Sequence, residues 1–361
     1  VDLAEPATLA PFVARADVVL NLAGPYTRLA PPVIAVCLDH GAHYVDLTGE
    51  APLAHRTDLL HDDARAAGVA IVHTAGFEAL PADILVDAAR RHAATSGEHL
   101  RSADLVTSVN APAGTGREEM ISGGTAQSLV EVLRDPEPAR LGDPAVRLAG
   151  LRAHAGTAVD PDAVRRCSPI RLRPRRSAGA VLAPMTPLAA INPPVVHRTQ
   201  ALSPVAGAAA TPLAFREATS LGCWGGTAGW ARLAAAWLAA ATQLAAVLAS
   251  RLPHPVRARL ADVLSRRLPP SGSGPQGDVL TGWSWETKGR FTTHEGGRFH
   301  GVLQAEGNPG YGTTAWMAAE LALHMAQGVP ETALGSSTPA LALDGHLEAL
   351  IPARVRIRLG E

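Results

Sequence analysis

The pattern over residues 17–76 constrains the fold more than any other feature, because short apolar runs alternate there with longer segments of helical character. A short, mostly apolar run that ends at Gly or Pro is typical of a strand buried on both faces of a parallel sheet. Such runs occupy residues 17–23, 44–47 and 69–73. Because helical segments separate the three runs, the pattern predicts a parallel α/β sheet whose crossover connections all have the same hand.

The connecting helices are predicted from the residues at their ends. Pro31 and Pro32 are expected to open the first helix, and Gly41 follows its last apolar positions as the residue after the C-cap. A more polar helix is expected over residues 52–67, with Gly68 as its stop. Beyond the third strand, the sequence predicts a helix over residues 81–95 and one more strand over residues 103–109.

These elements predict an α/β protein with two domains and a C-terminal extension. Residues 1–112 are expected to form the distal part of a Rossmann-like, nucleotide-binding parallel sheet whose first strands are missing. Residues 113–306 are expected to form a mixed α/β domain for substrate binding or dimerisation. Residues 307–361 are expected to supply helices over 313–327 and about 341–350, which pack back on the first domain, and a final strand at 355–359.

A β-hairpin is the strongest local signal in the second domain. Trp283, Trp285 and Thr287 alternate with polar neighbours, residues 295–298 supply a turn, and residues 299–306 return as the second strand.

An alanine-rich helix over residues 230–250 has two alternative interpretations. Its uncharged stretch 233–250 is long enough to span a membrane, but nine alanines and a central Thr242-Gln243 make insertion close to break-even. The favoured interpretation is a helix packed on the second domain or on a partner subunit in a homodimer, through a stripe of Leu233, Trp237, Leu244 and Leu248. The alternative is peripheral membrane contact, with Trp224, Trp230 and Trp237 at the interface and an arginine cluster at 165–176 near lipid headgroups.

Composition excludes several partner classes. The formal net charge of −1 and the pI near 7.0 argue against nucleic acid as a partner and against a surface-wide attraction to anionic membranes. The three cysteines, Cys37, Cys167 and Cys223, form neither a disulfide framework nor a zinc motif, which fits a reducing cytoplasm. The histidine pairs of the first domain lack further ligands, so no metal is expected.

The candidate site lies where the parallel strands end, because ligands of such sheets bind beyond the carboxyl ends of the strands. A glycine at such a point lets a cofactor approach the backbone closely, although the same glycine can simply make a turn. The candidate cofactor-binding residues after the three strands are Ala23, Gly24, Pro25, Tyr26, Gly49 and Gly76.

Several ordered motifs carry a family resemblance. They are Leu20-Asn21-Leu22-Ala23-Gly24-Pro25-Tyr26, residues 41–50, residues 76–83, Ser122-Gly123-Gly124-Thr125 with Ser128, and Gly307-Asn308-Pro309-Gly310-Tyr311. Together they resemble the saccharopine dehydrogenase-like oxidoreductases, and within that group the branch that includes trans-acting enoyl reductases. Where the family usually carries Asp and then Ser, this chain has Glu78 and Ala79. The family has Asp at the position of Asn308.

The resemblance implies a nicotinamide-dependent reductase that uses NADP(H), or NAD(H), without a metal. The reaction it implies is reduction of an enoyl or related double bond in a hydrophobic, lipid-like substrate of lipid or glycolipid biosynthesis. The expected location is the cytoplasm, at the inner face of the plasma membrane. The candidate catalytic residues are Tyr26, Asp46 and Glu50, with Glu78 as a further proton donor. The alternative for Asp46 and Glu50 is structural, as a helix cap or an arginine partner.

The family's Gly-x-x-Gly-x-x-Gly loop, which binds the pyrophosphate after the first strand, does not occur in this sequence. We therefore expect the chain to be truncated at its N-terminus and, as it stands, to bind a dinucleotide weakly. The alternative to an enzyme is a non-catalytic, membrane-associated or scaffold protein that keeps the fold without the cofactor.

Overall fold

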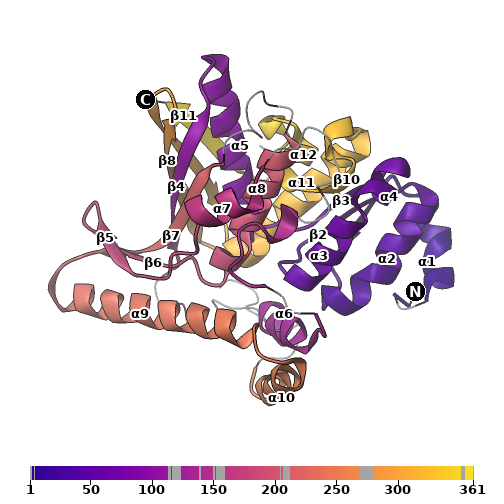
Figure 1. Ribbon diagram of the computed structural model, residues 1–361, viewed down its shortest axis with the longest axis horizontal. Helices are drawn as coiled ribbons and strands as arrows, with labels where there is room; N and C mark the ends of the chain where they lie inside the picture. The colour runs from indigo at the N-terminus through magenta and orange to yellow at the C-terminus, as the bar shows by residue number, and fades with distance from the viewer. Residues whose placement is uncertain are drawn as a thin grey trace.

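The computed structural model describes residues 2–3, 5–112, 115, 123–137, 140–148, 151, 159–203, 205, 212–268, 280–350 and 354–360, without the side chains of 123–126. Two sheets organise these residues (Figure 1). Sheet A lies on the right of the view, with α2 (Tyr26–His40), α3 (Ala51–Leu59) and α4 (His61–Ala66) around it. Sheet B lies on the left, and a long helix, α9 (Gly226–Ala249), runs along the lower edge.

Sheet A confirms the predicted parallel α/β architecture. Its strand order is β1-β2-β3-β10, and every neighbouring pair is parallel. The first three strands are the predicted ones. The fourth comes from the C-terminal part of the chain and pairs with β3. The strands are β1 (Val18–Asn21), β2 (His43–Asp46), β3 (Ala70–Val72) and β10 (Gly335–Ser337).

Helix α2 (Tyr26–His40) begins five residues before the predicted start at Pro31. Proline inside a helix removes a backbone donor, and here the Arg56 guanidinium donates to the Thr27 carbonyl oxygen at 3.5 Å. Gly41 ends the helix in the left-handed conformation with φ 75°, as predicted. The prolines therefore lie inside the helix. The helix begins earlier, at Tyr26, because the distant Glu50 carboxylate accepts hydrogen bonds from its first N–H groups.

The expected helix over residues 52–67 is two helices, α3 (Ala51–Leu59) and α4 (His61–Ala66), separated at Leu60. Other helices of this part of the molecule are α1 (Pro6–Val13) and α5 (Leu80–Thr95), and α5 matches its prediction within one residue.

Sheet B has the order β11-β9-β8-β4-β7-β6-β5. The strand expected at residues 103–109 lies here rather than in the first sheet, because β4 pairs with β7 in parallel and with β8 in antiparallel orientation. The predicted hairpin is confirmed as β8 and β9. The strands are β4 (Leu100–Asn110), β5 (Arg175–Ser177), β6 (Ala180–Ala183), β7 (Ala214–Cys223), β8 (Ser284–Thr293), β9 (Arg298–Glu306) and β11 (Arg356–Gly360).

The helices between the sheets join both into one core. Helix α5 contacts β4 and β8 of sheet B, whereas α11 contacts β1 and β2 of sheet A and α12 contacts β3. The same cluster of buried side chains includes Val45 and Val72 from sheet A and Leu105 and Trp285 from sheet B. The connecting helices are α6 (Gly123–Arg134), α7 (Pro161–Cys167), α8 (Asn192–Leu202), α9 (Gly226–Ala249), α10 (His254–Ser265), α11 (Thr314–Gln327) and α12 (Pro339–Leu343).

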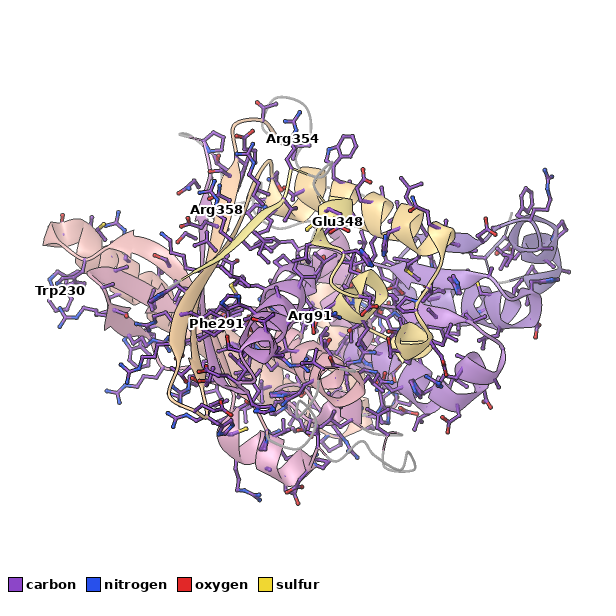
Figure 2. The ribbon with its side chains drawn as sticks, turned by 90° about the horizontal axis from the view of Figure 1, so that it is seen from above. Arg91, Trp230, Phe291, Glu348, Arg354 and Arg358 are labelled. Atoms are coloured by element: carbon purple, nitrogen blue, oxygen red, sulfur yellow. The ribbon has the colours of Figure 1, made fainter. Side chains whose placement is uncertain are left out.

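The last predicted helix, at about 341–350, is wrong in its bounds. Helix α12 ends at Leu343, and Asp344 follows it in the left-handed conformation with φ 44°. A separate single turn covers Leu347–Leu350. Seen from above in Figure 2, this C-terminal part lies over α5, where Arg91 donates to Asp344 at 2.8 Å.

A buried ionic cluster joins the two halves of the chain. Asp58 of α3 is fully buried and accepts hydrogen bonds from Arg147 at 2.8 and 3.1 Å and from Ser336 at 2.7 Å. Arg198 of α8 lies 3.1 Å from the same carboxylate. Burial opposes the charged form of Asp58, but the two guanidinium groups hold its pKa below the ordinary value.

We expect Asp58→Ala to destabilise the protein by about 3–5 kcal/mol, because it leaves two buried guanidinium groups without their partner. Urea unfolding followed by circular dichroism would measure the loss. The matched control is Arg65→Ala, which breaks the exposed Arg65–Glu331 pair (3.2 Å) and should cost less than about 1 kcal/mol. Equal losses in the two variants would contradict this assignment.

Candidate functional site

The carboxyl ends of β1, β2 and β3 lie side by side, since Asn21 is opposite Asp46 and Val45 is opposite Val72. The segments that follow these strands therefore meet at one edge of sheet A. The structure brings all the predicted site residues to this edge: Ala23, Gly24, Pro25 and Tyr26 from the first segment, Asp46, Gly49 and Glu50 from the second, and Gly76 and Glu78 from the third.

Asp46 is the centre of a fully buried network. Its carboxylate accepts hydrogen bonds from the Tyr44 hydroxyl at 2.9 Å and from the Thr48 N–H at 3.0 Å, and it lies 2.9 Å from Nδ1 of His73. Nε2 of His73 in turn lies 2.8 Å from Oγ1 of Thr57. Since three protein groups, the Tyr44 hydroxyl, the Thr48 N–H and the His73 ring, contact the Asp46 carboxylate, this geometry favours the structural alternative for that residue.

Glu50 is also buried, and it caps α2. Its carboxylate accepts the Tyr26 N–H at 3.1 Å, the Thr27 N–H at 2.6 Å and the Ser128 hydroxyl at 2.8 Å. The first N–H groups of a helix have no partner inside the helix, and a negative charge at that end is favourable. Glu50 therefore explains why α2 starts at Tyr26, and it ties α6 to sheet A.

Tyr26 lies beside this carboxylate. Burial, together with the negative charges of Asp46, Glu78 and Glu50, raises the pKa of its phenol well above the ordinary value. The phenol consequently stays protonated at neutral pH. It can donate a hydrogen bond but does not readily release its proton.

Glu78 differs from the other carboxylates because its Oε2 atom is buried and has no hydrogen-bond partner among the described residues. Burial raises the pKa of Glu78 to about 7, and the nearby charge of Asp46 adds to the shift. A carboxyl group with such a pKa is half protonated near neutral pH, which suits a general acid.

The glycines of the edge have different neighbours. A Cβ added at Gly49 would lie 2.5 Å from the Ile191 side chain, and one at Gly76 would lie 2.5 Å from Oε2 of Glu78. At both positions a Cβ would crowd a neighbouring side chain, so packing within the protein accounts for the glycine. The segment after β1 is open, since Leu22 is 61% exposed and Ala23, Gly24 and Pro25 are half-buried. This segment is the accessible part of the predicted cofactor set.

Sheet B presents polar groups toward the same region. The Phe77 ring, just after β3, packs edge-on against Trp285 of β8 at a centroid distance of 5.0 Å. On β7, Glu217 accepts a hydrogen bond from Nδ2 of Asn192 at 2.8 Å. Burial raises the pKa of Glu217 to about 8. Asn192 directly follows Ile191, the residue that packs against Gly49.

Sequence reasoning missed Glu217 and Asn192. A local signal for Glu217 was present, because it lies two residues after Phe215 and therefore on the face of the strand that Phe215 buries. Oε1 of Glu217, Oδ1 of Asn192 and the Tyr311 hydroxyl are, like Glu78, buried without a partner among the described residues. Unpaired buried polar atoms are uncommon in native proteins. Others occur elsewhere in the described residues, for example at His197 and Gln243, and those of Glu78, Glu217 and Asn192 are near the carboxyl edge of sheet A.

Comparison with known proteins identifies the family. The family model described as the saccharopine dehydrogenase NADP binding domain matches residues 1–72. Trans-acting enoyl reductases of Mycobacterium bovis and Mycobacterium tuberculosis are each 31% identical to this chain over 97% of its length and 82% of their own. The chain belongs to this family.

The protein is thus an NADP-dependent oxidoreductase of the saccharopine dehydrogenase-like type. Among solved structures, the apo saccharopine dehydrogenase (L-Glu forming) of Saccharomyces cerevisiae matches all of this chain and 88% of its own at 10% identity, with a TM-score of 0.48. Among the described residues, no group of three or more metal-ligating side chains is placed to hold an ion. Of the family motif at 122–125, Ser122 and the side chains of 123–125 lie outside the described residues.

We expect Glu50→Ala to cost about 2 kcal/mol or more of unfolding free energy, because it leaves two N–H groups at the start of α2 without an acceptor. Ser128→Ala removes one hydrogen bond to the same carboxylate and should cost about 1 kcal/mol. Chemical denaturation of both variants would measure the difference. A Glu50 variant as stable as the Ser128 variant would rule out the capping role.

Proposed function

We propose that the protein reduces the carbon–carbon double bond of a hydrophobic, enoyl-type substrate with NADPH as the reductant. The observation that carries the proposal is Glu78, a carboxyl group at the carboxyl edge of sheet A whose buried Oε2 has no partner and whose pKa is raised to about 7. The names of the relatives, trans-acting enoyl reductases, support the same reaction.

The chain offers a surface for the nicotinamide end of the cofactor. The accessible segment Leu22–Pro25 would hold it, since it follows a parallel strand and its backbone is the most open of the three strand ends. When bound, NADPH supplies the hydride. The pyrophosphate needs a glycine-rich loop, which the described strand ends do not contain.

Reduction of a double bond consumes one hydride and one proton. Glu78 in its acid form would give the proton to the carbon that does not receive the hydride, and the resulting carboxylate would be reprotonated from solvent. The Tyr26 phenol, which stays protonated, would donate a hydrogen bond to a polar group of the substrate beside the double bond. Asp46 and Glu50 would position these groups through their networks rather than exchange protons.

The substrate class that we propose is an acyl chain of lipid or glycolipid biosynthesis. Phe77 and Trp285, which pack against each other beside the edge of sheet A, would give an apolar wall on the side of sheet B. Glu217 of β7 and Asn192 at the start of α8, which are hydrogen-bonded to each other, would contact a polar part of the substrate.

Cofactor binding is the first test. We expect the protein to bind NADPH in a fluorescence titration, with NADH binding more weakly. No binding of either nucleotide would refute the proposal and would favour a protein that kept the fold but lost the cofactor.

The pH dependence is the second test. Because the donor must be protonated, kcat/KM with NADPH should be level below pH 7 and should fall about tenfold per pH unit well above it. Glu78→Gln should lose this limb and lower kcat by about 10²–10⁴-fold. Glu331→Gln, at a largely exposed position, is the control and should keep the wild-type profile. A Glu78→Gln enzyme with the same falling limb would exclude Glu78 as the donor.

A further inference from the structure

Helix α9 leaves most of its large apolar residues exposed. The buried positions that face the protein are Gly229, Ala236, Ala240, Gln243 and Val247. The large apolar side chains point outward and are exposed as follows: Trp230 66%, Trp237 52%, Leu238 67%, Leu244 45% and Leu248 53%. A helix of a soluble domain normally buries its large residues, so the outward face of α9 is suited to an apolar partner.

Exposed apolar side chains continue along the chain through Leu252 and onto α10. Leu252, Val256 and Val263 are 42%, 48% and 50% exposed. Figure 2 shows the α9 end of this surface from above, where Trp230 lies at the outer edge of the molecule while Phe291 lies inside it. The packed side of α9 contacts β6 and β7, and the packed side of α10 contacts α6. We call the outward side of the two helices the α9–α10 face.

Positive charge surrounds the α9–α10 face. Arg251, Arg259, Arg266 and Arg267 are exposed, and none of them forms an ion pair with another residue that the structure describes. From residue 218 to 268 the single acidic residue is Asp262, which pairs with Arg134 at 3.0 Å. On α10 the exposed Val256, Arg259, Val263 and Arg266 follow helical spacing, so apolar and basic side chains share one stripe.

The outer end of α9 holds an aromatic and cationic group. Trp224 and Trp230 pack edge-on at 5.1 Å, and the Arg176 guanidinium lies 4.7 Å from the centre of the Trp224 ring. Tryptophan is enriched where apolar and aqueous phases meet, and arginine beside it binds lipid phosphates.

We infer that the α9–α10 face docks on the surface of an anionic lipid bilayer. Helix α9 lies in the plane of the interface, with Trp230, Trp237 and Leu238 in the acyl region and the arginines against the headgroups. Apolar area and basic charge on one face are the combination that such interfacial helices use.

Two other arrangements fit the observations less well. In a twofold dimer the same patch faces itself, so the four unpaired arginines of each copy would be brought toward one another. A membrane-spanning α9 would have to leave β6 and β7, although by length and composition it is the one helix in the described part of the chain that could cross a bilayer. Its buried positions and the hydrogen bond from Thr186 to the Ala239 carbonyl at 3.3 Å hold it along the protein.

Vesicle flotation tests the inference independently of any reductase activity. We expect the protein to float with phosphatidylglycerol-containing vesicles and to remain in the bottom fraction with pure phosphatidylcholine vesicles. High salt should release it from the anionic vesicles. The double variant Trp237→Ser with Leu238→Ser should lower the vesicle-bound fraction about tenfold or more. Arg259→Ser with Arg266→Ser should remove the preference for anionic lipid.

The matched control is Trp316→Ser with Leu323→Ser on α11, where the side chains are 58% and 59% exposed on another helix. This variant should float like the wild type, and the thermal midpoints of all variants should agree. Wild-type protein that remains in the bottom fraction with anionic vesicles would overturn the inference. An equal loss of the vesicle-bound fraction in the control variant would also overturn it. A dimer in light scattering that Trp237→Ser with Leu238→Ser converts to monomer would show that a second copy covers the face.

Discussion

Three distant parts of the chain meet at the carboxylate of Asp58. Arg147 reaches it from the segment before α7, Arg198 from α8 and Ser336 from β10, and together they surround a charge that has no access to water. Such a cluster stabilises a structure only when it is complete, since each buried charge is costly without its partners. The position of α8 relative to sheet A therefore depends on it. The start of α8 places Ile191 and Asn192 beside the candidate site.

The candidate site illustrates how one sheet edge can hold carboxylates of different character. The carboxylates of Asp46 and Glu50 each have three partner groups from the protein, whereas Glu78, whose pKa the charge of Asp46 also raises, lacks a partner for one oxygen. Groups whose surroundings separate their protonation behaviour are a recurrent basis for assigning acid and base roles. From the sequence, Asp46 and Glu50 were candidate catalytic residues and Glu78 a further candidate donor, and the hydrogen-bond partners around each carboxyl group now distinguish them.

Local signals were sufficient for much of the fold. The apolar runs of β1, β2 and β3, the glycine at position 41 and the alternation in β8 and β9 are all read within a few residues. The start of α2 could not be predicted from nearby residues, because its cap, Glu50, lies far along the chain. The sheet to which β4 belongs could not be predicted from nearby residues either, because β4 pairs with the distant strands β7 and β8. For the same reason, Glu78 could be named from its place after a strand, whereas Glu217 and Asn192 depend on packing between distant segments.

The pairing of β10 with β3 has a consequence for how the protein is made. Ser336 lies opposite Ile71, so β10 can join sheet A only after the long stretch of chain between β3 and β10 has been synthesised. Until then β3 has an unpaired edge, and its apolar residues are available to other chains. Contacts between such distant residues form slowly because a long loop must close first. Sheet A, although its first three strands precede sheet B in the sequence, is therefore completed only after most of sheet B has been synthesised, and a ribosome that stopped before β10 would release a chain prone to aggregation.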